Sequence, residues 1–311
     1  MKTLILTSLV LISLVLGAEL MHPVFNFHGS GFDTQVTNTS GVVSDEVKKN
    51  DENNNKKDYV EPVLTSPIQQ DFDIKEELQE TGQMKDTRSP YWWLNSGGIF
   101  YSEDGVGKTV QGELSEDNPW RVLYNKNNPR DTDNGYHPQN IFRLVTRSTW
   151  KNFQQDSYFR IVKDNLSASS YRSASNGLLL FNRYQDGDNL YYTGIRVDGF
   201  AVIKKKINGQ YFTMAYERVF PGKYDRKKKP NLLPLHQWIG LRSEVSDTEN
   251  GSVNIKVFMD RNRDGNWKLV AEATDNGKSF GGKVIAESGH AGIRTDFMDV
   301  EFDDYRIEEM K

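Results

Sequence analysis

The sequence contains no cysteine and only five histidines among its 311 residues. The absence of cysteine excludes disulfide bonds, thiolate metal sites, a cysteine nucleophile and a lipid anchor on an N-terminal cysteine. A folded domain must therefore be held together by its apolar core, and roughly 220 residues are enough to build one. The net charge of -4 is small, so nucleic acid is not an expected partner.

Long apolar runs are missing after the first twenty residues. Met1-Lys2 give a short basic start, Leu4 to Leu16 are almost wholly apolar, and Gly17-Ala18 are small. This pattern predicts a secretory signal peptide over residues 1–18, with an uncleaved N-terminal anchor as the alternative. The run is short for a membrane span. We therefore expect a secreted, extracellular or cell-surface associated protein, with no stable membrane insertion after cleavage.

Apolar residues are also scarce between residues 19 and 89. The stretch Lys48 to Asp58, which reads KKNDENNNKKD, has none at all. Such a segment cannot bury enough apolar surface to offset the entropy of its chain. We expect residues 19–89 to form a disordered polar linker, followed by a single domain over residues 90–311.

The composition changes at Pro90-Tyr91-Trp92-Trp93, where aromatic and β-branched residues begin to recur in short runs. Asn-Gly and Asp-Gly pairs separate these runs at intervals of roughly ten residues, a strong signal of β-hairpins. No long 3.6-residue period is present. The sequence predicts an all-β, antiparallel two-sheet β-sandwich (jelly roll) with few helices. The expected strands include Arg121 to Tyr124 and Lys283 to Ser288.

Alternation along the expected strands separates two faces. Between Tyr191 and Val197, Ile195 and Val197 point to one face, and Tyr192 and Arg196 point to the other. Basic residues interrupt apolar runs in the same way at Arg143, Arg147, Arg183, Arg196, Lys204, Lys206 and Arg242. One interpretation is a solvated polar face. The other is a basic, aromatic-lined groove for an acidic polysaccharide, because arginine binds carboxylates bidentately and aromatic rings contact sugar faces.

Several segments follow one another in a recognisable order: Asn176 to Asp186, Trp238 to Leu241, Val253 to Asp260, Gly289 to Arg294 and Phe302 to Ile307. This order resembles the concanavalin A-like lectin/glucanase superfamily, in its laminin G-like jelly-roll branch. The resemblance covers about residues 142–307. The superfamily includes lectins, carbohydrate-binding modules, glycoside hydrolases and polysaccharide lyases, so it implies a fold without choosing an activity.

The resemblance to jelly-roll polysaccharide lyases implies a set of site residues. These enzymes use a Tyr or His to remove the proton α to a uronate carboxylate, which Arg, Gln or Asn neutralises. The candidate catalytic residues here are His137, Tyr192 and Arg143, although His137 can also be read as a loop histidine without a chemical role. The candidate ligand-binding residues are Gln139, Asn140, Arg147, Arg183, Arg196, Lys204 and Arg242.

Paired acids of the kind that glucanases carry in a short Glu-x-Asp-x-x-Glu strand motif are absent from the sequence. A retaining glycosidase needs two carboxylates about 5 Å apart. If the protein is an enzyme, a polysaccharide lyase is therefore favoured over a glycoside hydrolase.

No cofactor is required by these interpretations, but a structural calcium ion is compatible with the sequence. Asp260, Asn262 and Asp264 alternate as at the start of a calcium loop, although Ala271 stands where an EF-hand has its glutamate. A plain Asp-Gly hairpin is the alternative. The resemblance implies Asp303 in the last strand as a further ligand.

Together these features predict a secreted carbohydrate-binding β-sandwich protein, monomeric, whose partner is a polysaccharide. The arginines on the expected strands favour an acidic polysaccharide over a neutral one. Two alternatives stay open. One is a lyase that cleaves a uronate-containing glycan by β-elimination, and the other is an adhesion or protein-binding laminin G-like domain.

Overall fold

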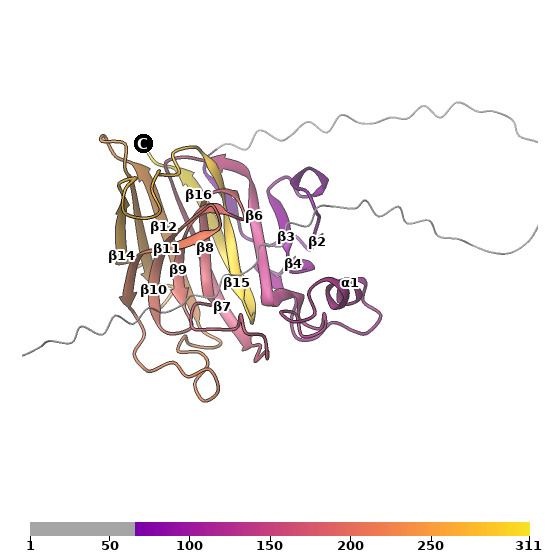
Figure 1. The fold of residues 1–311 in the computed structure, drawn as a ribbon. Coiled ribbons are helices and arrows are strands. Elements are labelled where there is room, and N and C mark those ends of the chain that lie inside the picture. The colour runs from indigo at the N-terminus through magenta and orange to yellow at the C-terminus, as the bar shows by residue number, and fades with distance from the viewer. Residues whose placement is uncertain (1–65) are drawn as a thin grey trace, which may run out of the picture.

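The computed structural model describes residues 66–311, so the predicted signal peptide and most of the predicted linker lie outside the described residues. Two antiparallel sheets stack face to face in the described part of the chain (Figure 1). This confirms the predicted all-β, two-sheet sandwich. Across residues 66–311, none of the helices has the length and apolar character that a membrane crossing requires.

One sheet has nine strands, in the order β14-β13-β12-β7-β16-β5-β4-β2, with β1 added on β16. Its strands are β1 (Ile68–Gln70), β2 (Glu76–Gln79), β4 (Ile99–Glu103), β5 (Val106–Thr109), β7 (Phe153–Asp164), β12 (Trp238–Asp247), β13 (Val253–Asp260), β14 (Lys268–Asp275) and β16 (Met298–Glu309).

The other sheet has seven strands, in the order β11-β10-β9-β8-β15-β6-β3. Its strands are β3 (Trp92–Ser96), β6 (Ile141–Trp150), β8 (Gly177–Asp186), β9 (Asn189–Arg196), β10 (Phe200–Ile207), β11 (Gln210–Arg218) and β15 (Gly289–Asp296). Short hairpins join β8 to β9, β9 to β10 and β10 to β11, as the Asp-Gly and Asn-Gly pairs predict.

The main core fills the space between the two sheets. Phe142 of the seven-stranded sheet stacks on Phe302 of the nine-stranded sheet, with their ring centroids 5.5 Å apart. Ile195 belongs to this core, whereas Tyr192 belongs to a second apolar cluster with Val145, Leu179, Phe181 and Val202. Because neighbours in a strand point to opposite faces, the second cluster lies on the outer face of the seven-stranded sheet. That sheet is therefore apolar on both sides, and its outer face carries more than solvated polar groups.

The predicted start of the folded domain at residue 90 is too late. Residues 68–70 and 76–79 form β1 and β2, which pair with β16 and β4. Ile68, Phe72 and Leu78 are buried in the main core. Each is a lone apolar residue among polar ones, because an edge strand buries only one side. The polar composition of this segment therefore resembles that of a linker even though the segment is part of the sandwich.

A helix replaces the strand expected at Arg121 to Tyr124. Helix α1 (Pro119–Asn127) begins with the side chain of Asn118 accepting a hydrogen bond from the Trp120 N–H, and with Pro119 in its first turn. Both features favour a helix start. Two short 3-10 helices, η1 (Met84–Asp86) and η2 (Pro138–Asn140), complete the elements. The strand expected at residues 283–288 is irregular chain leading into β15.

Candidate functional site

A cleft opens on the outer face of the seven-stranded sheet, above the second apolar cluster. It is a shallow hollow that is continuous with solvent. We call it the basic cleft; it is lined by Arg143, Phe181, Tyr184, Gly187, Leu190, Tyr192, Lys206, Tyr211 and Arg294. Three of these residues are cations, and none of the described lining residues is acidic. Of the predicted catalytic residues, Arg143 and Tyr192 meet here.

Tyr211 stands at the centre of the positive charge in the basic cleft. Its ring meets the ring of Tyr192 edge-on, with the centroids 6.0 Å apart. The Nζ atom of Lys206 lies 5.0 Å from the Tyr211 centroid, and the Nζ of Lys204 lies 5.9 Å from it. Arg294 hydrogen-bonds Tyr211. Cations at these distances favour a phenolate over a neutral phenol.

The pKa of Tyr211 is lowered from its ordinary value of 10.0. Burial acts to raise this pKa, but the charges of Arg294, Lys206 and Arg143, together with the hydrogen bond from Arg294, outweigh it. Tyr184, in the same cleft, shows the opposite result. Burial raises the pKa of Tyr184, and Arg143 offsets only part of that rise. Of this pair, Tyr211 is thus the tyrosine whose phenolate form the surrounding cations favour.

The three cleft cations differ in how firmly they are held. Arg294 donates from Nε to Asp296 Oδ1 at 2.9 Å, and Lys206 donates to the Gly187 carbonyl at 2.7 Å and to Asp188 Oδ1 at 3.1 Å. For Arg143, the described part of the chain offers neither a hydrogen bond nor an ion pair. A planar guanidinium without such a partner can bind a carboxylate with two parallel hydrogen bonds.

Three further predicted residues lie on the same outer face but outside the lining of the basic cleft. Lys204 is buried beside Tyr211. Arg196 pairs with Asp198 at 2.9 Å and lies over the ring of Tyr216. Arg147 donates to the Ser89 carbonyl at 3.2 Å. Alternation predicts that Arg143 shares a face with Arg147 and that Tyr192 shares a face with Arg196, but of these four residues only Arg143 and Tyr192 line the cleft.

The segment containing His137, Gln139 and Asn140 does not reach the basic cleft. The His137 ring contacts Asp133 Oδ2 at 3.1 Å in the turn before β6. Gln139 and Asn140 are fully buried; Gln139 donates to Asp299, and Asn140 donates to the Asp131 carbonyl. These three predicted site residues therefore lie outside the lining of the basic cleft.

Arg183 and Arg242 make contacts within the protein, outside the basic cleft. Arg183 is completely buried and donates to the Lys151 and Ile285 carbonyls and to Asp247. Its φ of +48° and a register shift after Asn182 break the alternation on which its assignment depended. Arg242 lies on β12 of the other sheet, where it pairs with Asp156 and stacks on Trp267. Neither residue therefore lines the basic cleft.

The four predicted calcium ligands do not present free oxygens to a common point. The carboxylate of Asp260 accepts the backbone N–H groups of Asn262, Asp264 and Gly265 and the hydroxyl of Tyr158. Asp303 forms an ion pair with the guanidinium of Arg263. These contacts are those of a plain Asp-Gly hairpin, which is the alternative to a calcium loop. Within residues 66–311 no group of three or more His, Asp or Glu side chains is arranged to hold a metal ion.

The predicted site residues omit seven of the cleft residues, among them Tyr211, Lys206 and Arg294. The sequence contains a signal for the first two. A two-residue Asn208-Gly209 turn fixes the register of the hairpin, and this register pairs Lys206 with Tyr211. The face of Arg294 can be predicted from its neighbour Ile293. Ile293 lies in the core, so the next residue along the strand must face outward.

Comparisons with known proteins give similarity in structure only. No family model matches the chain, and no curated protein matches it. Among solved structures, the carbohydrate-binding module CBM66 from Bacillus subtilis is 15% identical, with a TM-score of 0.39, over 55% of this chain and 83% of that one.

Two enzymes are also similar in structure. The GH43 protein BlXynB from Bacillus licheniformis is 12% identical, with a TM-score of 0.40, over 78% of this chain and 39% of that one. A prokaryotic β-1,3-1,4-glucanase from a mouse hindgut metagenome is 10% identical, with a TM-score of 0.41, over 79% of this chain and 100% of that one. At these identities and TM-scores, the similarities assign no ligand and no activity to this chain.

Proposed function

We propose that this protein is an extracellular carbohydrate-binding β-sandwich that holds an acidic polysaccharide in the basic cleft. The observation that carries the proposal is the meeting of Arg143, Lys206 and Arg294 around Tyr192 and Tyr211, with no acidic residue among the described lining residues. A uronate unit would place its carboxylate at Arg143 and its ring against the tyrosines. Secretion and the laminin G-like branch belong to the same proposal and rest on the sequence.

The test is binding of the full mature chain to polygalacturonate, with a neutral β-glucan of similar length as the matched polymer. We expect polygalacturonate to bind and its affinity to fall as salt rises, because the contacts are between charges. The neutral glucan should bind weakly or not at all. Equal affinity for both polymers, independent of salt, contradicts an acidic ligand. Failure of a broad panel of acidic and neutral polymers to bind contradicts the carbohydrate role and favours the protein-binding alternative.

The lowered pKa of Tyr211 specifically favours a second candidate, a polysaccharide lyase. In this reaction the Tyr211 phenolate takes the proton from C5 of a uronate unit whose carboxylate is bound by Arg143. The C4–O bond breaks as the C4–C5 double bond forms, and the leaving oxygen receives a proton. The step is redox-neutral, and Arg143 and Arg294 stabilise the charge that develops on the carboxylate.

The lyase candidate predicts ultraviolet absorbance from a new unsaturated uronate end when the protein is mixed with the polymer that it binds. Tyr211→Phe should reduce this rate by about 100-fold or more, the usual effect of removing a general base, while polymer binding changes little. Tyr184→Phe is the matched control in the same cleft. A bound polymer that gains no absorbance identifies the protein as a binding module.

A further inference from the structure

The loop that joins β11 to β12, residues 219–237, carries a concentration of positive charge. Between residues 223 and 229 it reads KYDRKKK, five basic side chains and one acidic one, in a chain whose net charge is -4. In Figure 1 this loop extends below the ends of the strands. We call residues 223–229 the basic tip. None of them lines the basic cleft, so the proposed function does not account for their charge.

The lysines of the basic tip are accessible to an external anion. Four of its five cations are the exposed lysines Lys223, Lys227, Lys228 and Lys229. Within residues 66–311, none of the four side chains forms an ion pair or donates a hydrogen bond. Like charges held on one short loop repel one another, and an anionic partner relieves that repulsion.

Hydrogen bonds hold the backbone of the basic tip in one folded turn. The Asp225 N–H donates to the Lys229 carbonyl at 3.0 Å, and the Lys229 N–H donates to the Asp225 carbonyl at 2.9 Å. The Asp225 carboxylate accepts the backbone N–H groups of Lys227 at 2.9 Å and Lys228 at 2.8 Å. The one acidic side chain of the tip is thus used to close the turn, and the lysines project together from it.

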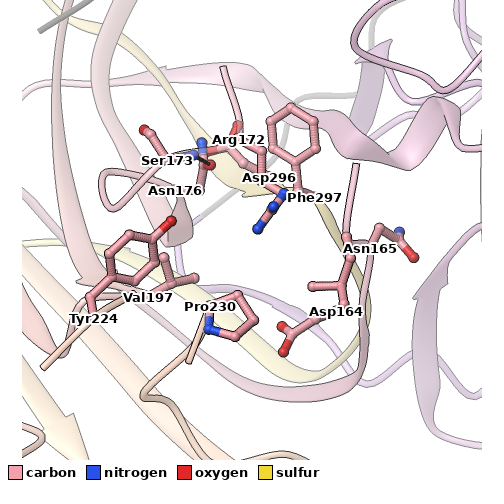
Figure 2. Close-up of a pocket in the computed structure, with 11 residues that line it drawn as sticks. Asp164, Asn165, Arg172, Ser173, Asn176, Val197, Tyr224, Pro230, Asp296 and Phe297 are labelled. Carbon is pink, nitrogen blue, oxygen red and sulfur yellow. Dashed lines mark hydrogen bonds between the residues drawn. The ribbon is translucent and has the colours of Figure 1, made fainter. Parts of the chain in front are cut away.

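An exposed leucine lies beside the basic tip. The Arg226 guanidinium donates to the Ala168 carbonyl at 3.1 Å, which ties the segment after β7 to the tip. Leu166 belongs to that segment and is 65% exposed. It also lines the small hollow at which Figure 2 shows Tyr224 and Pro230 of the loop. A large apolar side chain therefore stands in water next to a cluster of cations.

Cations beside an exposed apolar side chain fit an anionic lipid bilayer better than a dissolved polyanion. Lysines are attracted to the negative surface potential of an anionic leaflet, and an apolar side chain among them can enter the boundary between head groups and acyl chains. A hydrated acidic polymer would satisfy the lysines but leave Leu166 in water. A single exposed leucine is ordinary on a protein surface, so its position beside the cations carries the argument.

We infer that the basic tip and Leu166 form a docking surface for an anionic lipid bilayer. The lysines contact the lipid phosphates, and the Leu166 side chain enters the boundary below them. This attachment is peripheral and needs no membrane-spanning segment. It does not rest on polysaccharide binding, because none of the residues that line the basic cleft belongs to the docking surface.

The first test is sedimentation of the full mature chain with vesicles of equal parts phosphatidylglycerol and phosphatidylcholine, compared with vesicles of phosphatidylcholine alone. We expect binding to the anionic vesicles only, weakening as salt rises. Lys227→Gln with Lys228→Gln should weaken this binding about 30-fold, which corresponds to ~2 kcal/mol. The matched control, Lys126→Gln with Lys278→Gln, removes two exposed lysines elsewhere and should change binding less than about twofold. Binding to neither vesicle, equal binding to both, or equal losses in the two double variants overturns the inference.

The second test asks whether Leu166 enters the bilayer, and it uses the absence of cysteine from the chain. Leu166→Cys gives the protein a single thiol for an environment-sensitive fluorophore. Ile74→Cys, at a 78% exposed position between β1 and β2, is the matched control. We expect anionic vesicles to shift the emission of the label at residue 166 to shorter wavelength, and polygalacturonate to leave it unchanged. No shift at residue 166, or the same shift at residue 74, contradicts a lipid surface.

The lipid surface and the polysaccharide function fail separately. If the Lys227 and Lys228 double variant loses vesicle binding and keeps its affinity for polygalacturonate, the docking surface is supported. If the variant loses both to the same extent, the basic tip serves the polymer and the lipid surface is wrong. If vesicles bind through the tip and no polysaccharide binds, the docking surface stands and the proposed acidic-polysaccharide function fails.

Discussion

Lys204, Lys205 and Lys206 follow one another on β10, yet the middle lysine and its neighbours face opposite sides of the sheet. Lys205 points between the sheets, where its Nζ lies 2.8 Å from Asp275 on β14 and donates to the Gly282 and Lys283 carbonyls. Both side chains of this ion pair are completely buried. Lys204 and Lys206 point outward, toward the ring of Tyr211.

The comparison separates charges that hold the fold from charges that a ligand can use. On the inner face the cation, the carboxylate and the Tyr191 hydroxyl satisfy one another, with the hydroxyl 2.6 Å from Asp275. On the outer face three cations line a cleft without an acidic lining residue, and Arg143 has no hydrogen-bond or ion-pair partner among the described residues. A change on the inner face should therefore alter stability, and a change on the outer face should alter binding.

The largest expected effect is the loss of the inner ion pair in Lys205→Met. This change leaves the Asp275 carboxylate buried without its cation, which typically costs about 3–5 kcal/mol of unfolding free energy. Urea unfolding measures it. The outer-face control is Lys206→Met, which leaves its partner Asp188, 45% exposed, in contact with water, so its loss should cost less than that of Lys205. Equal losses in the two variants would remove the distinction between the faces.

The next effect belongs to the outer face alone. Arg143→Gln should weaken acidic-polymer binding by about 10- to 100-fold, because charge-assisted hydrogen bonds contribute about 1.5–3 kcal/mol. Its unfolding free energy should stay within about 0.5 kcal/mol of the wild type, since no hydrogen bond or ion pair of the described chain is lost. Arg242→Gln, on the other sheet, is the control for binding. A strong loss of stability without a loss of binding would assign Arg143 to the fold.

The sequence predicted the fold well where burial is two-sided or alternating, and less well at the edges. The hairpin at Asn208-Gly209 and the split between Tyr192 and Ile195 follow from turn chemistry and the two-residue period. β1 and β2 were missed because one apolar residue in a polar edge strand has no period to detect. Helix α1 forms in place of the expected strand because the Asn118 cap and Pro119 favour a helix start over a short apolar run.

The candidate site was only partly predictable, and the physical reason differs from the one that limited the prediction of the fold. Alternation gives the face of a residue, so Arg143 and Tyr192 were found. It cannot say which outer residues meet across strands, because that depends on register. It also fails at a bulge, where Arg183 leaves the pattern. Tyr211 needed the register of its hairpin, and Arg294 needed the pairing of β15 with β6, which are far apart in sequence.

A smaller effect tests whether the outer-face cations act on Tyr211. Lys206→Met removes one of the charges that lower the pKa of Tyr211, so its phenolate should form at a higher pH than in the wild type. The measurement is the ultraviolet titration of tyrosinate, taken as the difference between each protein and the same protein carrying Tyr211→Phe. An unchanged midpoint would show that burial and the arginines alone set this pKa.

The smallest expected effect concerns Glu80, a carboxyl that directly follows β2 of the nine-stranded sheet. Asp275 has a lysine, whereas Glu80 accepts hydrogen bonds only from the Tyr124 hydroxyl at 2.5 Å and the Gly98 N–H at 2.8 Å among the described residues. Burial raises the pKa of Glu80 from 4.5 to about 7, and these hydrogen bonds and the charge of Arg143 only partly oppose the rise. The folded protein therefore binds a proton that the unfolded chain has already lost between these two values.

Stability should consequently fall as the pH rises from about 4.5 to about 7 and stay lower above that range. Glu80→Gln keeps an oxygen that can accept both hydrogen bonds and removes the ionisation. We expect the variant to match the wild type near pH 4.5 and to exceed it by ~1 kcal/mol at pH 8, or ~2–4 °C in Tm; this is below the ~3 kcal/mol of an unscreened shift because Glu80 is only half-buried. Exposed Glu77→Gln on β2 should show no such dependence. A gain that is equal at both pH values would mean that Glu80 contributes through packing and not through its ionisation.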